Sequence, residues 1–245
     1  MQIVVVSGGS SGIGLSCVKK FLSEEHIVYN LDIVNNDITN PNYKYIKTDV
    51  CNSEEIRQSI KHIISESKQI DSIVVSAGKH LSATIENTSD EDLMHILYLN
   101  LLGAFWFIQA VIPHMKEQNG GAIVTIGSDQ CTIAKTSSSA YGMTKAALGS
   151  LTKSTALDYA KYNIRVNCIG AGTIDTPLYR NAIDRYSKKS GIPLLEIEKE
   201  EAMMQPIGRV GNPDEVAELA YFLTTKEASF MTGGVIPFDG GYSAR

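Results

Sequence analysis

Short runs of β-branched and aliphatic residues alternate with longer segments of mixed polarity along the whole chain. Several of these runs are apolar at consecutive positions, which is typical of strands covered on both faces of a parallel sheet. The longer segments between them would supply the crossover helices. The pattern predicts one α/β domain, residues 1–245, with a doubly wound parallel sheet and helices on both faces. The predicted strands are residues 3–6, 27–31, 43–47, 72–76, 122–126, 164–169 and 235–238.

Helix starts are marked by side chains that can accept hydrogen bonds from the free N–H groups of a first turn. Asn52 is followed three positions later by Glu55, and Ser89 in the same way by Asp92. Asn212 precedes a proline that would occupy the first helical position. These patterns predict helices that begin directly after Asn52, Ser89 and Asn212.

One stretch, residues 178–205, lacks clear periodicity and is polar around Gly191. It follows the sixth predicted strand, and ligands of open α/β sheets bind beyond the carboxyl ends of the strands. We therefore expect this stretch to be an insertion within the single domain that closes over a substrate as a lid.

The charge balance is mildly acidic, with 22 Lys and Arg against 27 Asp and Glu and a net charge of −5. Because no basic cluster stands out, the sequence predicts neither a nucleic acid partner nor binding to an anionic membrane. The longest apolar stretch, residues 101–112, is shorter than the ~20 residues of a membrane span. An apolar run already begins at Ile3, which leaves no space there for an export leader, and we expect a cytoplasmic protein.

The cysteines and histidines give no sign of a metal site. The four cysteines are scattered without a C-x-x-C pair, and no two of the five histidines are four residues apart. We expect reduced thiols and no bound metal.

A glycine-rich segment directly follows the first predicted strand and precedes a helical pattern. Glycine lacks a Cβ atom, so the backbone can turn tightly and approach a pyrophosphate at the positive end of the next helix. This arrangement is typical of a Rossmann-type dinucleotide site. The candidate residues are Gly8, Ser10, Ser11, Gly12, Ile13 and Gly14.

Asp32 closes the second predicted strand, eighteen residues after Gly14. A carboxylate at this place can accept hydrogen bonds from the ribose hydroxyls of an adenosine, and it would repel a 2′-phosphate. No Lys or Arg occurs in the glycine-rich segment to attract such a phosphate. Asp32 therefore favours NAD over NADP as the cofactor.

The residue types of a proton-transfer site occur around Tyr141. Lys145 lies four positions later on the same helix face, so its ammonium could favour the ionised phenol and lower the pKa of Tyr141. Ser128, at the end of the fifth predicted strand, could orient the reacting oxygen with its hydroxyl. The set predicts acid–base chemistry on an alcohol or carbonyl group.

With these motifs, the chain resembles a classical short-chain dehydrogenase/reductase over essentially its whole length. The family's Tyr-x-x-x-Lys pair matches Tyr141 and Lys145, its serine matches Ser128 and its asparagine matches Asn100. The resemblance implies a homotetramer and further cofactor contacts besides those of Tyr141 and Lys145. These contacts are Asp49, Val50, Ser76, Ala77, Gly78, Ile174 and Thr176.

Together these features predict an NAD-dependent oxidoreductase that transfers a hydride between the cofactor and a secondary alcohol or ketone. In the chemistry that the resemblance implies, Tyr141 transfers the hydroxyl proton, Lys145 holds the ribose and Asn100 positions a water. We expect a small polar substrate, such as a polyol, a sugar acid or a hydroxy acid. The candidate substrate contacts are Ser128, Gln130, His80 and Arg180, of which Arg180 would suit an anion.

Two alternatives stay open at this point. A 3-oxoacyl thioester (acyl carrier protein) reductase would share the four catalytic residues, although such enzymes generally prefer NADP. A non-catalytic regulator that binds a dinucleotide could also be built on this fold, but it would not need those four residues.

Overall fold

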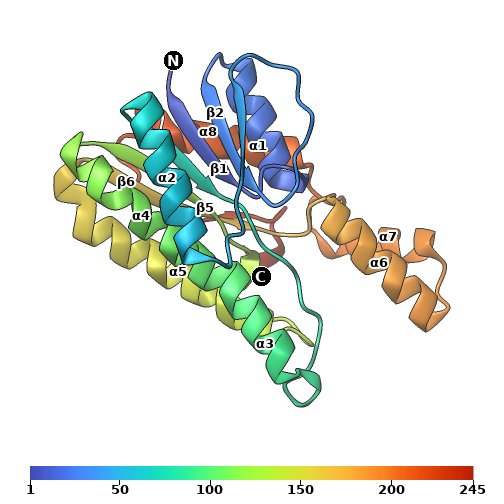
Figure 1. Cartoon of the computed structure of the whole chain (residues 1–245). Helices are drawn as coiled ribbons and strands as arrows, with labels where there is room; N and C mark the ends of the chain where they lie inside the picture. The colour runs from blue at the N-terminus through green and yellow to red at the C-terminus, as the bar shows by residue number, and fades with distance from the viewer. Residues whose placement is uncertain (245) are drawn as a thin grey trace.

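The computed structural model describes residues 1–244, which form a seven-stranded parallel sheet between two layers of helices (Figure 1). Each predicted strand is present, so the predicted fold class is confirmed. The strands are β1 (Ile3–Ser7), β2 (Ile27–Asp32), β3 (Tyr43–Lys47), β4 (Ser72–Val75), β5 (Gly121–Ile126), β6 (Ile164–Ala171) and β7 (Val235–Phe238).

Helices cover both faces of the sheet, and this explains the uninterrupted apolar runs. In β1, Val5 packs into the core shared with α2, α4 and α5, whereas its neighbours Val4 and Val6 pack into the core shared with α1 and α8. Successive strand residues point to opposite faces, so both positions must be apolar. The helices are α1 (Gly12–Ser23), α2 (Ser53–Ser67), α3 (Asp90–Leu97), α4 (Gly103–Glu117), α5 (Ser139–Tyr159) and α8 (Pro213–Thr224).

The three predicted helix starts are confirmed. The side chain of Asn52 accepts a hydrogen bond from the N–H of Glu54 at the start of α2, and Ser89 accepts one from Asp92 at the start of α3. Asn212 caps α8 in the same way, with proline at the first helical position. Local hydrogen bonding therefore sets these helix boundaries.

The strand order is β3-β2-β1-β4-β5-β6-β7, so β2 and β3 lie on one side of β1 and the later strands, from β4 on, lie on its other side. Connections that leave two neighbouring strands toward opposite sides open a crevice at the carboxyl ends of those strands. β1 ends at Ser7, just before the glycine-rich segment, and β4 ends at Val75, just before Ser76. The fold thus places two predicted cofactor-binding segments on either side of this crevice.

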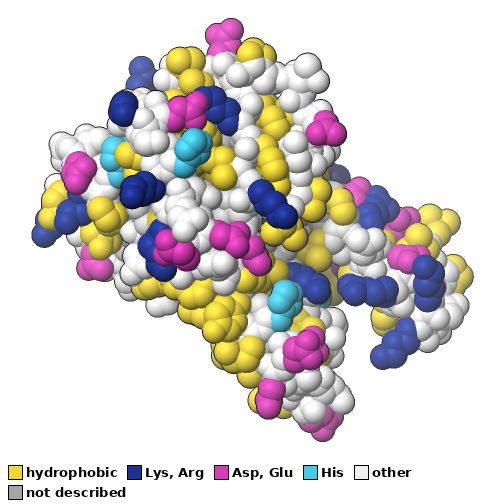
Figure 2. Space-filling view, viewed as in Figure 1, with side chains coloured by type: hydrophobic (Ala, Val, Ile, Leu, Met, Phe, Trp, Pro, Cys, Tyr) yellow, Lys and Arg dark blue, Asp and Glu magenta, His cyan; other side chains and the backbone are white. Residues whose placement is uncertain are grey.

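Residues 178–205 belong to a helical hairpin, α6 (Pro177–Ser190) and α7 (Leu194–Met204), that projects from the body of the molecule (Figure 1). Figure 2 shows charged side chains of both signs across this projection. Ile183 and Ile197 are the buried apolar residues of the two helices. With so few buried positions, the hairpin leaves little periodic signal in the sequence.

The continuous helical segment Asp90–Glu117 is, by length and mean hydropathy alone, able to cross a membrane. In the fold, however, 44% of its most apolar window is buried, and Phe107, Val111 and Met115 pack into the core against the sheet. The core helix of a soluble protein passes the same test. Figure 2 also shows apolar side chains gathered on the surface over α3, α4 and α5, where Phe105 is exposed.

Arg165 on β6 ties the end of α8 to the sheet. Its guanidinium donates hydrogen bonds to the carbonyl oxygens of Leu223 at 2.8 Å, Ala228 at 3.0 Å and Thr225 at 3.1 Å. Leu223 lies in the last turn of α8, and Thr225 and Ala228 lie in the segment that follows this helix. The side chain thereby satisfies several backbone acceptors at once.

We predict that Arg165→Met lowers the free energy of unfolding by about 3 kcal/mol, because partly buried carbonyl groups lose hydrogen bonds from a charged donor. Urea unfolding measures the change. Arg57→Met is the matched control, since Arg57 forms an exposed ion pair with Glu54 on α2 and its removal should change stability little. Equal stability of the two variants would contradict the role given to Arg165.

Candidate active site

A cavity of about 830 Å³ opens at the carboxyl ends of the central strands. The glycine-rich segment and Asp32 line one part of it, and Ser128, Tyr141 and Lys145 line another. The fold therefore brings most of the predicted cofactor residues and the proton-transfer residues into one cavity, whereas Ser10 and Gly14 do not line it. The other predicted cofactor residues in its lining are Asp49, Val50, Ser76, Ala77, Gly78, Ile174 and Thr176.

The glycine-rich segment is held against the end of β4 by contacts that exclude side chains. Gly8 has a positive φ of 69°, and a Cβ atom there would lie 2.6 Å from the Cα atom of Ala77. A Cβ atom on Gly14 would lie 2.1 Å from the carbonyl oxygen of Gly8. Any other residue at Gly8 would push the segment away from the residues after β4, and any other residue at Gly14 would force the turn of the segment itself open.

Asp32 and Asn30, at the end of β2, organise the backbone of the same segment. The Asp32 carboxylate accepts hydrogen bonds from the N–H groups of Ser10 at 3.0 Å and Val34 at 3.2 Å. The buried side chain of Asn30 accepts one from the N–H of Gly9 at 3.0 Å. A carboxylate has about four acceptor positions, so Asp32 keeps capacity for ribose hydroxyls. The residues present fit a dinucleotide, and the role of Asn30 was not predicted.

Ser128 lies at the start of the one-turn helix η3 (Asp129–Cys131), directly after β5. Its hydroxyl accepts a hydrogen bond from the N–H of Gln130 at 3.2 Å and donates one to the Asp129 carboxylate at 2.9 Å. Burial raises the pKa of Tyr141, and a hydrogen bond between the side chains of Ser128 and Tyr141 partly offsets this rise. The serine and the tyrosine thus form one polar unit.

The ammonium of Lys145 lies 5.7 Å from the ring centre of Tyr141 and donates a hydrogen bond to the carbonyl oxygen of Ile126 at 3.0 Å. Burial nevertheless raises the pKa of the Tyr141 phenol well above its usual range, and the Asp129 carboxylate adds to this rise. Burial also lowers the pKa of Lys145. The expectation that Lys145 lowers the pKa of Tyr141 is therefore wrong for the cofactor-free chain, because desolvation outweighs the charge.

Asn100 is buried in a π-helical turn, η2 (Tyr98–Leu102), between α3 and α4. Its side chain accepts a hydrogen bond from the N–H of Lys79 and donates one to the carbonyl oxygen of Lys79, both at 2.9 Å. It also donates to the Thr144 hydroxyl at 3.3 Å, next to Lys145 on α5. Asn100 thus fixes the loop that follows Gly78 to the helix that carries Tyr141, and it does not line the cavity itself.

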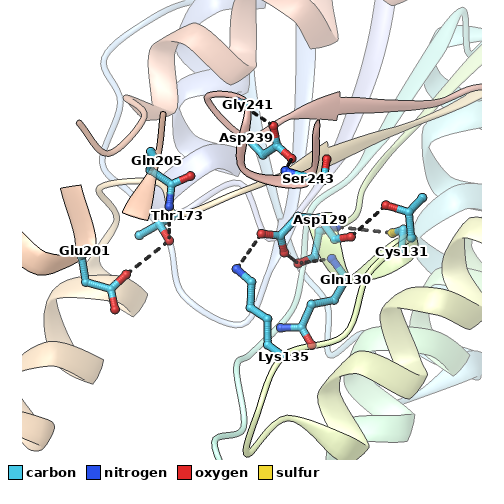
Figure 3. Close-up of polar contacts among 12 residues, drawn as sticks. Asp129, Gln130, Cys131, Lys135, Thr173, Glu201, Gln205, Asp239, Gly241 and Ser243 are labelled. Atoms are coloured by element: carbon cyan, nitrogen blue, oxygen red, sulfur yellow. Dashed lines mark hydrogen bonds and ion pairs between the residues drawn. The ribbon is translucent and has the colours of Figure 1, made fainter. Parts of the chain in front are cut away.

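The wall of the cavity beyond Tyr141 is polar. The ring of His80 packs edge-on against Tyr141 with 4.7 Å between the ring centres, and burial lowers its pKa. Figure 3 shows Lys135 pointing at Asp129, where the two charges form an ion pair at 2.5 Å. The buried Oε1 of Gln130 accepts no hydrogen bond from residues 1–244. Two predicted substrate contacts, His80 and Gln130, therefore lie in the cavity lining.

Arg180, the fourth candidate substrate contact, does not line the cavity, whereas Ser128, Gln130 and His80 do. Its guanidinium forms two hydrogen bonds with Asp175, at 2.5 and 2.6 Å, and an ion pair with Glu198 on α7. The arginine therefore ties the hairpin to its own base. This position contradicts the expectation that Arg180 offers its charge to an anionic substrate, because the charge is already neutralised within the hairpin.

The base of the hairpin still reaches the cavity through Tyr179 and Glu201. Figure 3 shows Glu201 and Gln205 converging on Thr173, whose hydroxyl lies 3.5 Å from each side chain. Neither these three residues nor the Asp129–Lys135 pair were predicted from the sequence. The sequence did offer a signal for this pair, because Asp129 directly follows Ser128 and Lys135 lies shortly before Tyr141. Within residues 1–244, no three His, Cys, Asp or Glu side chains gather as a metal site would require.

Comparison with known proteins agrees with this geometry. A family model described as "Enoyl-(Acyl carrier protein) reductase" matches residues 8–243. L-fucose dehydrogenase of Rattus norvegicus is 34% identical over 248 residues, which cover 98% of this chain and 88% of that protein. A short-chain dehydrogenase family protein from Francisella tularensis subsp. tularensis SCHU S4 is 40% identical, with a TM-score of 0.94 and full coverage of both chains. Aldohexose dehydrogenase of Thermoplasma acidophilum is 35% identical, with a TM-score of 0.93 over 100% of this chain and 94% of that one.

The chain belongs to the short-chain dehydrogenase/reductase family of oxidoreductases, which use nicotinamide cofactors and act on small molecules. Its curated relatives include dehydrogenases of sugars, polyols and alcohols.

We predict that the phenol of Tyr141 stays protonated to above about pH 10 in the cofactor-free protein, because burial disfavours the phenolate. Ultraviolet difference titration of the parent against Tyr141→Phe isolates this one phenol from the other ten. The two proteins should ionise alike below about pH 10. Extra phenolate in the parent near neutral pH would show that the charge of Lys145 outweighs burial in setting the pKa of Tyr141.

Proposed function

We propose that the chain is an NAD(H)-dependent dehydrogenase that oxidises a hydroxyl group of a small, neutral, polyhydroxylated substrate such as an aldose or a polyol. The polar cavity wall formed by Ser128, Gln130, His80 and the Asp129–Lys135 pair carries this proposal. Neutral donors and acceptors of this kind suit hydroxyl groups. The similarity to L-fucose dehydrogenase and aldohexose dehydrogenase supports the same substrate class.

The charges around the site favour a neutral substrate over a sugar acid or hydroxy acid. Lys135 is paired with the buried Asp129, the lowered pKa of His80 favours its neutral form at neutral pH, and Arg180 is paired outside the cavity. Glu201 adds a further carboxylate to the lining. An anionic substrate would therefore compete with Asp129 for Lys135, and of the other two lysines in the lining Lys145 is assigned to the cofactor and Lys79 is exposed to solvent.

In the proposed reaction, the bound nicotinamide supplies the acceptor or donor of the hydride. Tyr141 exchanges the proton of the substrate oxygen, and the Ser128 hydroxyl orients that oxygen. Because the phenol is protonated at neutral pH, Tyr141 is ready to donate a proton to a carbonyl; oxidation of an alcohol requires the phenolate. Lys145 would hold the ribose of the cofactor, and Asn100 would keep the neighbouring loop in place.

We propose NAD as the cofactor on the evidence of Asp32. Its carboxylate faces the cavity at the end of β2, and none of the lining residues at that end, from the glycine-rich segment to Val50, is Lys or Arg. A 2′-phosphate would meet the carboxylate of Asp32, with Asp49 in the same part of the lining, and no compensating cation.

Three wider proposals follow from the resemblance and the surface. The hairpin α6–α7 acts as a lid within a single domain, because its base lines the cavity. The exposed apolar side chains of Phe105 on α4 and Leu157 on α5 belong to subunit contacts of a homotetramer. The protein is cytoplasmic, in agreement with its four free thiols.

We predict that kcat/KM with NAD exceeds that with NADP by about thirtyfold to a thousandfold, which corresponds to roughly 2–4 kcal/mol. Asp32→Ser should narrow this ratio at least tenfold, whereas Asp37→Asn, which removes an exposed charge nearby, should leave it unchanged. The assay uses aldoses, polyols and a 3-oxoacyl thioester with both cofactors. A preference for NADP, or for the thioester, would overturn the proposed function.

We predict that Gln130→Ala raises KM for the best sugar or polyol by about tenfold, the value of one hydrogen bond. Arg180→Ala should change KM less than about twofold, because the guanidinium contacts Asp175 and Glu198 instead of the cavity. Steady-state kinetics of both variants decide the matter. A larger effect of Arg180→Ala would favour an anionic substrate.

A further inference from the structure

Cys131 and Cys168 lie directly beside the proposed proton-transfer residues but take no part in the proposed reaction. Cys131 ends the turn that Ser128 starts, next to Gln130 (Figure 3), and Cys168 lies in β6. Their sulfur atoms are 3.9 Å apart. The Sγ of Cys131 also accepts a hydrogen bond from the N–H of Ser128 at 3.4 Å. The Sγ of Cys131 therefore contacts both the Sγ of Cys168 and the backbone of Ser128, whose hydroxyl belongs to the proposed proton-transfer site.

No side chain separates the two sulfur atoms. A Cβ atom on Gly127 would lie 2.5 Å from the Sγ of Cys168 and 2.8 Å from the Sγ of Cys131. Any residue other than glycine at this position would push the sulfurs apart. The close approach of the pair thus depends on the residue just before Ser128.

The four thiols of the chain differ in reactivity. Burial raises the pKa of Cys17 to about 12, and burial together with Asp49 raises that of Cys51 to about 11. The pKa of Cys131 instead lies below its usual range, chiefly because Cys168 donates a hydrogen bond to its sulfur. Cys131 is also partly exposed, while Cys168 is buried. Since the thiolate is the reactive form, Cys131 is the thiol that an oxidant meets first.

We propose that Cys131 and Cys168 are an oxidation site for hydrogen peroxide, at which a reversible disulfide forms and displaces Ser128. The Cys131 thiolate attacks one peroxide oxygen, so that an S–O bond forms, the O–O bond breaks and hydroxide leaves to become water. The Cys168 thiol then attacks the sulfenic sulfur, so that the S–S bond forms and the hydroxyl leaves with the thiol proton as a second water. Two thiols are oxidised and one peroxide is reduced.

Formation of the bond shortens the sulfur separation from 3.9 Å to about 2.05 Å. The strand β6 is paired on both sides, so the short turn that carries Cys131 makes most of this movement. The turn takes with it the backbone of Ser128, whose hydroxyl must meet the substrate oxygen. A displacement of about 1 Å at such a group can cost about a hundredfold in rate. The loss of activity rests on the proposed function, whereas the disulfide itself does not.

The experiment treats the full, reduced chain with a small excess of hydrogen peroxide. Peptide mass mapping locates the crosslink, and kcat is measured before treatment, after it, and after dithiothreitol. We expect a bond between Cys131 and Cys168, at least a tenfold loss of kcat, and recovery on reduction. Cys51→Ser is the matched control and should behave as the parent. Cys168→Ser, which keeps a hydrogen-bond donor beside Cys131, should give no crosslink and should leave a sulfenic acid on Cys131 that dimedone labels; Cys131→Ala should give neither.

Three results would overturn the proposal. The first is oxidation of Cys51 or Cys17 in preference to Cys131, and the second is the absence of a bond between Cys131 and Cys168 in the parent. The third is a crosslinked protein that keeps its full kcat. If the chain turned over no carbonyl or alcohol, the proposed function would fail. Peptide mass mapping would still show whether the bond between Cys131 and Cys168 forms.

Discussion

The site depends on one close approach, that of the glycine-rich segment to the end of β4. A Cβ atom on Gly8 would come within 2.6 Å of the Ala77 backbone, so the two chain segments that bound the crevice touch without intervening side chains. The parallel pairing of β1 with β4 brings them there, at the point where the strand order reverses. Asn30 and Asp32 then hold the segment by its N–H groups. Every other proposed role, from cofactor binding to proton transfer, uses the cavity that this contact defines.

Burial and charge act in opposite directions at the proton-transfer group. An ammonium one helical turn away would lower the pKa of a tyrosine in water, but Lys145 is buried and Tyr141 is half-buried. Desolvation disfavours the phenolate and the ammonium alike, and the nearby Asp129 carboxylate disfavours the phenolate further. The free chain therefore holds Tyr141 as a proton donor. A positively charged oxidised nicotinamide would favour the phenolate, so binding and protonation would be coupled.

The substrate end of the cavity illustrates how ion pairs decide which charges a ligand can use. From the sequence, Arg180 was the cation expected to bind an anionic substrate, yet its guanidinium forms ion pairs with Asp175 and Glu198. Lys135 lines the cavity, yet it is paired with a buried carboxylate. Around the proton-transfer residues, a ligand meets chiefly the hydroxyl of Ser128, the amide of Gln130 and the imidazole of His80. This is the physical basis for a neutral, hydroxyl-rich substrate class.

The sequence by itself determined the parallel sheet, because a strand covered on both faces must be apolar at successive positions, as in Val4 to Val6. It also determined the starts of α2, α3 and α8, since a cap such as Asn52 acts within one turn. The glycine-rich segment, Asp32 and the Tyr141–Lys145 spacing were equally local patterns. Only the tertiary structure decided that Arg180 is neutralised by Glu198, that Lys135 meets Asp129 and that Cys131 faces Cys168. These contacts join separate elements, so their partners, and with them the burial that raises the pKa of Tyr141, exist only once the chain has folded.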